Sequence, residues 1–299
     1  MKYVFNIIIL IVLILVFRAA CDKEEVSGER QIYVAQNSKR SFYGAKLVKT
    51  IKNTLPQPIR IAADIDNDVL YIASEDSKNS GTIFKTELYG KVYDVLNIAD
   101  TLKITGLTIC KGNLFAAVGK TVIKYSLEED SLIKKYEIPI AHSLCFLEKD
   151  NKGTVYALDN QAGCIFKINA DTSEVFLKDS LCHESSTLCS DGTVLAGGVQ
   201  NKIYIFDKKG ATFFASLPSK LRGIRADRKG NYITTDSNGN IYAVSKDSVS
   251  VLLSKQDDKT GYADFEYIPQ QKLLLQPFSF GMNIYELGKY FEKNTENEQ

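Results

Sequence analysis

The sequence predicts an all-β protein: a six-bladed β-propeller of four-stranded antiparallel blades, closed by an N-terminal strand that completes the last blade. One phrase recurs six times: an apolar run, a polar turn that usually carries glycine, a second apolar run, a turn, and a third run rich in Ile, Tyr and Phe. A period of roughly 40 residues is typical of propellers and solenoids, and four strands per repeat fit propeller blades. Downstream of Cys21, no long stretch keeps the apolar spacing of a helix.

The start of the chain predicts an export signal. Residues 7–17, IIILIVLILVF, form an uninterrupted apolar run, which ends at Arg18. This length is typical of the hydrophobic region of a signal peptide, whereas a membrane-spanning helix needs about 20 apolar residues. The Ala-Ala-Cys ending resembles a bacterial lipobox, which implies a lipoprotein signal peptide over residues 1–20 and a lipid on Cys21. An ordinary cleaved secretory signal and a retained short anchor are the alternatives.

The rest of the chain divides into a tether, one propeller and a tail. Residues 21–44 are expected to be the lipidated cysteine and a flexible tether, because residues 22–30 have almost no apolar side chains to bury. The propeller is expected over residues 45–288, and residues 289–299 form a polar C-terminal tail. A two-domain β-sandwich is the alternative, but it does not explain the regular period of the repeats.

The six repeats are best aligned on their second apolar run, with nearly constant intervals between successive anchor positions: Leu70, Leu114, Val155, Val194, Tyr232 and Leu273. Five of the repeats continue into a looser amphipathic run, which is expected to be the outer strand of a blade. The last repeat, residues 262–287, lacks such a run. Residues 45–53 have the pattern of an outer strand and are predicted to supply it, which would leave no open sheet edge.

Composition excludes some partners and metal sites. All 36 acidic residues but only 35 of the 37 basic ones lie after residue 20, so the exported part has a net charge near −1. A nucleic-acid partner is therefore not expected, since it would need a basic patch. Five cysteines follow Cys21, with no CxxC pair and no metal-ligand spacing. We expect them to be structural and mostly unpaired, with one disulfide as the alternative: Cys110, Cys145, Cys164, Cys182 and Cys189.

The turns and the last repeat carry a resemblance to a known family. The corners Lys152-Gly153, Asp191-Gly192 and Lys229-Gly230, and the final phrase ADFEYIPQQKLLLQPFSFGMNIYEL, resemble six-bladed propellers of the senescence-marker-protein/gluconolactonase-like (TolB-like propeller) superfamily, in particular its bacterial lipoprotein-type members. The resemblance covers residues 45–287. It implies lactone hydrolysis with a divalent cation that a glutamate, asparagines and an aspartate hold in the central channel.

The ligand set that the resemblance implies is incomplete in this chain. Arg60 stands where the first-blade glutamate is expected, and a guanidinium has no lone pair to give a metal. Only two carboxylates match the family positions, Glu184 and Asp264, whereas hard cations need several oxygens. We therefore expect no metal and no cofactor, with a divalent cation as the alternative. The positions that match are Arg60, Thr105, His142 to Ser143, Glu184 to Ser185, Arg222 to Gly223, and Asp264.

These positions predict a polar recognition face at one mouth of the channel, because the start of each inner strand and the loop after each second strand face the same end. The predicted ligand-binding residues are Arg60, His142, Glu184, Arg222 and Asp264. The arginines could hold a carboxylate or a phosphate with two hydrogen bonds each. The alternative is that Arg60 pairs with Asp264, and Arg222 with Glu184, without any ligand. Loop residues 75–80 and 159–161 would either extend this face or be solvated turns.

Catalysis has weaker support in the sequence. His183 and Glu184 are candidates for general acid and base, since a histidine titrates near neutral pH. Adjacent residues of a strand point to opposite faces, however, and no other catalytic motif is present. The sequence favours a membrane-anchored, monomeric binding or interaction module of the bacterial cell envelope, on the inner or outer membrane and facing the periplasm or the cell surface. A small molecule or a protein would bind the mouth. A lactonase-type hydrolase with a divergent site and an envelope scaffold or signalling component are the alternatives.

Overall fold

A computed structural model describes residues 44–52, 55–74, 81–88, 92–98, 103–150, 152–178, 185–188, 194–197, 201–207, 210–227, 230–254, 264–279 and 281–289. The predicted signal peptide, Cys21, most of the predicted tether and all of the tail beyond Lys289 lie outside these residues. So do His183, Glu184, Cys182 and Cys189, and the loop residues 75–80. No helix in the described part of the chain is long and apolar enough to cross a membrane.

The described residues form 24 strands, which hydrogen-bond into six antiparallel sheets of four strands each. The first three sheets follow chain order: β2 (Pro58–Asp64), β3 (Val69–Ser74), β4 (Thr82–Glu87) and β5 (Val92–Asn97); β6 (Ile104–Cys110), β7 (Asn113–Val118), β8 (Thr121–Ser126) and β9 (Ser131–Glu137); and β10 (Phe146–Lys149), β11 (Val155–Asp159), β12 (Cys164–Ile168) and β13 (Ser173–Lys178).

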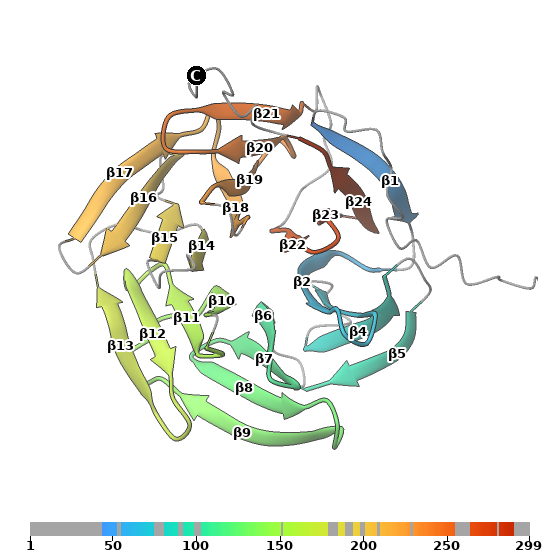
Figure 1. Ribbon diagram of the computed structural model, residues 1–299. Coiled ribbons are helices and arrows are strands. Elements are labelled where there is room, and N and C mark those ends of the chain that lie inside the picture. Colours follow the sequence, from blue (N-terminus) through green and yellow to red (C-terminus); the bar gives the residue numbers. More distant parts are fainter. Residues whose placement is uncertain are drawn as a thin grey trace, which may run out of the picture. The chain divides into compact units, whose positions relative to one another are not determined.

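The next two sheets repeat this order: β14 (Ser185–Leu188), β15 (Val194–Gly197), β16 (Lys202–Asp207) and β17 (Gly210–Ser216); and β18 (Leu221–Ala226), β19 (Tyr232–Asp236), β20 (Ile241–Val244) and β21 (Val249–Leu253). The six anchor positions of the sequence repeats each lie in the second strand of one sheet. Figure 1 shows the sheets around a common centre, with the first strand of each sheet innermost.

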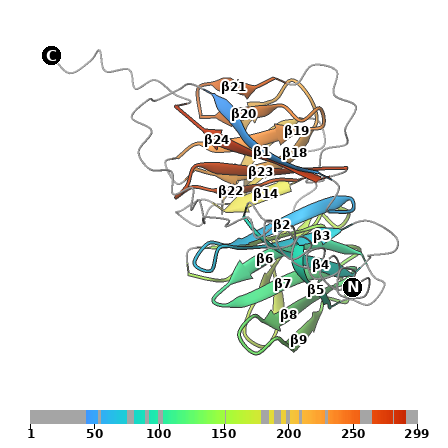
Figure 2. The same cartoon turned by 90° about the vertical axis from the view of Figure 1, so that its right-hand side faces the viewer.

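The last sheet joins the two ends of the described chain. It contains β22 (Glu266–Ile268), β23 (Leu273–Phe278) and β24 (Gly281–Leu287), and its outer strand is β1 (Ala45–Lys52). β1 pairs with β24 from Ala45 opposite Leu287 to Lys52 opposite Gly281, and Figure 2 shows the two strands side by side. The prediction that an N-terminal strand completes the last sheet is confirmed.

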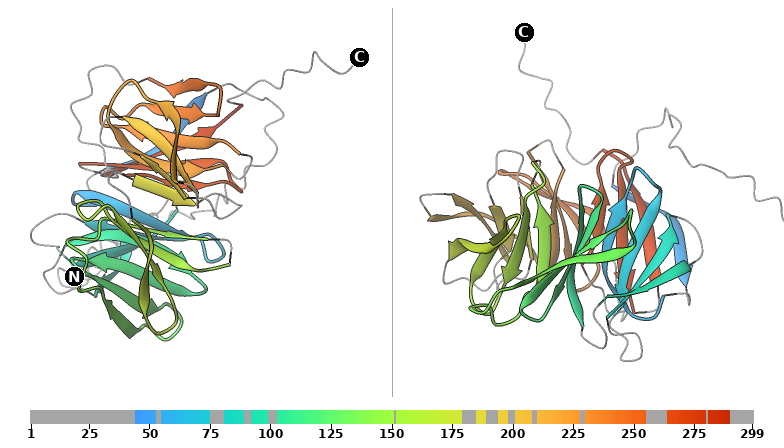
Figure 3. Two further views of the ribbon diagram at one scale, coloured as in Figure 1. Left: turned by 90° about the vertical axis from the view of Figure 1, so that its left-hand side faces the viewer. Right: turned by 90° about the horizontal axis from the view of Figure 1, so that it is seen from below.

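Apolar side chains fill the space between neighbouring sheets. One buried cluster joins Ile61 and Ile72 of the first sheet to Leu275 and Met282 of the last, and similar clusters join other adjacent pairs of sheets. The middle strands are buried almost throughout, as in β19, β20 and β23, whereas outer strands such as β1, β5 and β13 are largely exposed. Figure 3 shows the sheets from two further sides. Packing on both faces of the middle strands accounts for their continuous runs of β-branched and aromatic residues.

Candidate functional site in the channel

Arg60 does not form the ion pair expected from the sequence. Its guanidinium donates hydrogen bonds to three backbone carbonyls: Nε to Thr105 at 2.7 Å, one terminal nitrogen to Ile59 at 2.9 Å, and the other to Cys145 at 3.0 Å. These carbonyls belong to the first three sheets or the segments that lead into them. Arg60 therefore links the starts of neighbouring inner strands.

No hydrogen bond or ion pair joins the predicted mouth residues that the structure describes to one another. Arg222 is exposed, and it is the extra residue of a β-bulge, because Leu221 and Gly223 pair with consecutive residues of β19. His142 is exposed, and its backbone N–H donates to the carboxylate of Asp159. Glu184 lies outside the described residues, so the expected pair of Arg222 with Glu184 is not tested. The expected pair of Arg60 with Asp264 is wrong, since Asp264 binds a different arginine.

That arginine is Arg225, which the sequence reasoning did not select. Its two terminal nitrogens meet the two carboxylate oxygens of Asp264 at 3.0 and 3.3 Å. Its Nε lies 3.6 Å from Glu266, and its guanidinium carbon lies 4.8 Å from the centre of the Phe146 ring. The side chains of Arg225 and Asp264 are only 12% and 3% exposed. The pair is therefore joined by two hydrogen bonds and lies within the ring, where water screens its charges poorly.

Gly223 allows Asp264 to approach β18. A Cβ at this position would overlap the Oδ1 atom of Asp264 and would come within 2.6 Å of the Phe265 ring. The bulge at Arg222 turns the backbone just before Gly223, and bulges commonly re-aim neighbouring side chains. The sequence Leu221–Ala226 thus combines a bulge, a glycine that makes room and the arginine that binds the neighbouring sheet.

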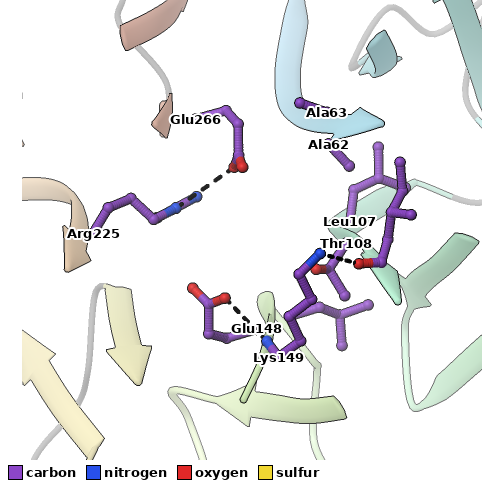
Figure 4. A pocket seen from close by; sticks show the side chains of 10 residues that line it. Ala62, Ala63, Leu107, Thr108, Glu148, Lys149, Arg225 and Glu266 are labelled. Atoms are coloured by element: carbon purple, nitrogen blue, oxygen red, sulfur yellow. Dashed lines mark hydrogen bonds and ion pairs between the residues drawn. The ribbon is translucent and has the colours of Figure 1, made fainter. Parts of the chain in front are cut away.

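Arg225 and Glu266 line a cavity in the middle of the ring (Figure 4). The cavity has a volume of about 40 Å³, enough for a few water molecules. Charged side chains come from β10, β18 and β22, and the walls from β2 and β6 carry only apolar side chains and one threonine. The lining residues are Ala62, Ala63, Leu107, Thr108, Ile109, Leu147, Glu148, Lys149, Arg225 and Glu266.

The cavity lies at a different depth from the predicted mouth. All its lining residues fall within the last four positions of the inner strands, whereas Arg60 and Arg222 lie near the strand starts. Arg60 precedes Ala63 by three residues, which is about 10 Å along a strand. The candidate site therefore lies towards the end of the channel where each inner strand turns into the second strand.

The carboxylates of the cavity hold their protons unusually strongly. Burial within the channel raises the pKa of Glu266 from 4.5 to about 7, and Arg225 opposes this shift while Glu148 adds to it. Burial also raises the pKa of Glu148, again against the effect of Arg225. Arg225 itself is held firmly in its charged form, because Asp264, Glu266 and Glu148 together raise its pKa against the effect of burial. Glu148 and Glu266 therefore titrate at higher pH than exposed glutamates, chiefly because they are buried.

Lys149 forms the rim of the cavity next to Glu148. Its side chain is exposed and its Nζ donates a hydrogen bond to the carbonyl of Ile109 on β6. Its backbone N–H donates to Glu148 Oε1 at 3.0 Å, which orients that carboxylate. Lys149 thus adds a positive charge at the cavity, and its ammonium is hydrogen-bonded to the neighbouring sheet.

The described polar clusters outside the cavity are structural. Asp236 is fully buried, and it accepts hydrogen bonds from the backbone N–H of Asn238 at 2.9 Å and of Asn240 at 3.0 Å, and from the Tyr242 hydroxyl at 2.8 Å. Asp159 has the same place in the third sheet and holds the turn that follows β11. Of the two alternatives for residues 159–161, these contacts favour a turn.

The three cysteines of the described chain form no disulfide with one another. Cys110 is buried and its thiol donates to the carbonyl of Gly153 at 3.1 Å, and the thiols of Cys145 and Cys164 also lie against backbone carbonyls. Burial raises the pKa of Cys110, which disfavours the reactive thiolate. Among the residues that the structure describes, no group of three or more His, Cys, Asp or Glu side chains is placed to hold a metal ion.

The ring of sheets is similar to solved propeller enzymes. A streptogramin B lyase structure superposes with a TM-score of 0.63 at 12% identity, over 82% of this chain and 98% of that one. A catalytically inactive histidine-to-alanine variant of virginiamycin B lyase from Staphylococcus aureus, determined with quinupristin, gives a TM-score of 0.60 at 14% identity, over 81% of this chain and 99% of that one. No family model and no curated protein sequence matches the chain. At these identities the likeness concerns the fold, and the chain is an all-β propeller of four-stranded antiparallel sheets.

Proposed function

We propose that the protein is a ligand-binding propeller whose recognition site is the channel cavity around Glu148, Arg225 and Glu266. In this proposal each of the six sheets is one blade of a six-bladed ring, as in the senescence-marker-protein/gluconolactonase-like propellers that the sequence resembles. The main support is the convergence of charged side chains from three sheets on one cavity. A cavity with a few convergent polar groups and shifted pKa values is the usual sign of a binding site.

The cavity is too small for a whole ligand. About 40 Å³ accepts one small polar group, so the rest of a ligand would extend along the channel. A similar propeller, the virginiamycin B lyase variant, was determined with quinupristin, and this supports the use of the fold for small-molecule binding.

Catalysis is the second candidate function, and Glu266 favours it. A carboxyl group with a pKa of about 7 can donate and accept a proton at neutral pH. The solved structures similar to this one include lyases. An enzyme of this kind would use Glu266 for proton transfer, in a lyase or in a lactonase-type hydrolase with a divergent site.

A thermal-melt screen of small molecules tests the binding function. A ligand at 100 times its dissociation constant stabilises the folded state by roughly 2.7 kcal/mol, which moves the melting midpoint measurably. We expect ligands that stabilise the unaltered protein to have no effect on the Glu148→Gln, Glu266→Gln double variant. Full stabilisation of that variant would place the site elsewhere and would refute the proposal.

The membrane anchor is a separate part of the proposed function, supported by the apolar run of residues 7–17 and by Cys21. In a bacterial host, lipid on Cys21 would tether the propeller to the inner or outer membrane. Labelling with a fatty-acid analogue should mark the unaltered protein and leave the Cys21→Ser variant unlabelled. Equal labelling of both proteins would contradict lipidation at this residue.

A further inference from the structure

The charges around the cavity do not balance. Three carboxylates, Glu148, Asp264 and Glu266, face two cations, Arg225 and Lys149. The inner strands β2 and β6 add no ionisable group to the cavity lining, and the sequence of β14 contains none. When all five groups are ionised, the described part of the site therefore has one excess negative charge.

Arg225 cannot satisfy all three carboxylates equally. Its terminal nitrogens are engaged by Asp264 at 3.0 and 3.3 Å, and one of them also donates to the carbonyl of Ile224 at 2.9 Å. Glu266 lies at 3.6 Å from Nε, which is longer than a charge-assisted hydrogen bond. Glu148 acts on Arg225 only at longer range. Glu148 and Glu266 thus keep acceptor capacity that Arg225 does not use.

The two sides of the cavity differ in chemistry. Figure 4 shows Glu148, Arg225 and Glu266 on one side, with Ala62, Ala63, Leu107 and Thr108 on the other. An ammonium group is about the size of a water molecule, so it fits a cavity of about 40 Å³. On the other side of the cavity the Lys149 ammonium is bound to the carbonyl of Ile109 on β6. An aliphatic stem attached to a ligand's ammonium would lie beside the side chains of Ala62, Ala63 and Leu107 from β2 and β6.

The geometry points to a protonated primary amine on an aliphatic stem as the group that this cavity binds, with its ammonium between Glu148 and Glu266. The inference rests on the proposed binding function and names its ligand class. An anionic group would double the excess negative charge, which opposes its binding in a poorly hydrated site. A divalent cation needs more oxygen ligands than the described residues supply. A single positive charge makes the site neutral.

Amine binding should depend on pH through Glu266. The pKa of about 7 means that roughly a tenth of Glu266 is ionised at pH 6 and roughly nine tenths at pH 8. The charged groups that face it are Glu148 and Lys149 on β10, Arg225 on β18 and Asp264 before β22. Since an alkylamine stays protonated up to about pH 10, its affinity should rise roughly tenfold between pH 6 and pH 8.

The test uses three probes of matched size: n-butylammonium, n-butyrate and n-butanol. Their binding is followed in NMR titrations through the methyl signals of Ala62 and Ala63, which line the cavity. Millimolar dissociation constants are expected for probes this small. Only n-butylammonium should shift these signals, more strongly at pH 8 than at pH 6. The Glu266→Gln variant should lose the pH dependence and bind more weakly, and the matched control Glu174→Gln, on the exposed strand β13, should behave like the unaltered protein.

The outcomes separate the ligand class from the binding function. Binding of n-butyrate or n-butanol, but not of the amine, would overturn the ligand class and retain the cavity as a binding site. Binding of magnesium in preference to the amine, with loss in the Glu266→Gln variant, would likewise refute the amine. If none of these probes shifts the two methyl signals, the amine inference is refuted. The proposed binding function is refuted only if the thermal-melt screen also finds no ligand whose stabilising effect requires Glu148 and Glu266.

Discussion

Replacement of Arg225 by methionine should destabilise the fold strongly. Methionine retains much of the side-chain volume but leaves Asp264, with 3% of its side chain exposed, without its two-point partner. Loss of one partner from a buried ion pair costs about 3–5 kcal/mol, because the other charge stays buried and unpaired. Glu266 also loses its only cation within 4 Å among the described side chains. We therefore expect the Arg225→Met variant to lose about 3 kcal/mol or more of unfolding free energy.

Equilibrium unfolding in urea measures this loss. The control is Lys134→Met on β9, where Lys134 and Asp171 are also 3.0 Å apart but their side chains are 33% and 90% exposed. Solvent screens such a pair, so the control should change stability by less than about 1 kcal/mol. Equal effects of Arg225→Met and Lys134→Met would refute the reasoning, because the Arg225 pair is buried and joined by two hydrogen bonds whereas the Lys134 pair is exposed and joined by one.

A second substitution tests the cause of the loss. If an uncompensated carboxylate destabilises the Arg225→Met variant, then adding Asp264→Asn should recover part of the stability. In the otherwise unaltered protein, Asp264→Asn should destabilise. Additive effects of the two substitutions would show that Arg225 stabilises the ring through its packing on Phe146 and not through Asp264.

Three further predictions concern pH, packing and ring closure. Below pH 4.5 Glu266 is protonated in both the folded and the unfolded state. Between pH 4.5 and about 7 only the folded state keeps the proton, so the free energy of unfolding should fall by roughly 3 kcal/mol as the pH rises through this range. Urea unfolding across this range should show a smaller fall in Glu266→Gln than in the control Glu174→Gln, and identical profiles would contradict the assignment. The Gly223→Ala variant should lose about 1–3 kcal/mol in thermal unfolding, because the new Cβ displaces Asp264; an unchanged midpoint would show that the neighbours give way freely. Deletion of residues 45–52 should abolish the near-ultraviolet circular dichroism of the folded ring, and a peptide of those residues should restore it by pairing with the free edge of the last sheet; a deletion variant as stable as the full chain would contradict closure.

The strands were predictable because the repeats and the burial pattern can be recognised within short stretches of the sequence. Every anchor position of the repeats lies in a second strand, and β1 covers residues 45–52 against the expected 45–53. The outer-strand pattern of residues 45–53, together with the lack of such a pattern after the last repeat, was sufficient to predict closure.

The site was less predictable because the contacts of its side chains depend on the exact register in which neighbouring strands pair. Asp264 was selected as a ligand-binding residue of the channel mouth; it is buried, and its partner is Arg225 and not Arg60. Bulges make Ile59 and Arg222 the extra residues of their strands. Arg60 therefore corresponds to Gly223 and not to Arg222. A shift by one residue moves a side chain to the other face of a strand, and turn glycines alone do not reveal it.

The cavity residues did leave a signal in the sequence. Glu148, Arg225 and Glu266 each directly follow a buried apolar residue at an inner strand. A charge at such a position must meet a partner or water, so these residues could have been singled out. The positions that match the metal ligands of the lactonases lie instead near the strand starts, as Arg60 and Arg222 do.

A direct measurement of the Glu266 pKa tests the central claim that Glu266 is buried in the channel close to the second carboxylate, Glu148. Carbon-13 NMR of the glutamate carboxyl groups, with Glu266 assigned through the Glu266→Gln variant, gives this value. The structure predicts a midpoint of about 7, and a lower midpoint in the Glu148→Gln variant, because Glu148 raises the pKa of Glu266. A midpoint near 4.5 that does not respond to Glu148→Gln would show that Glu266 is neither desolvated in the channel nor affected by the charge of Glu148, and it would contradict the account.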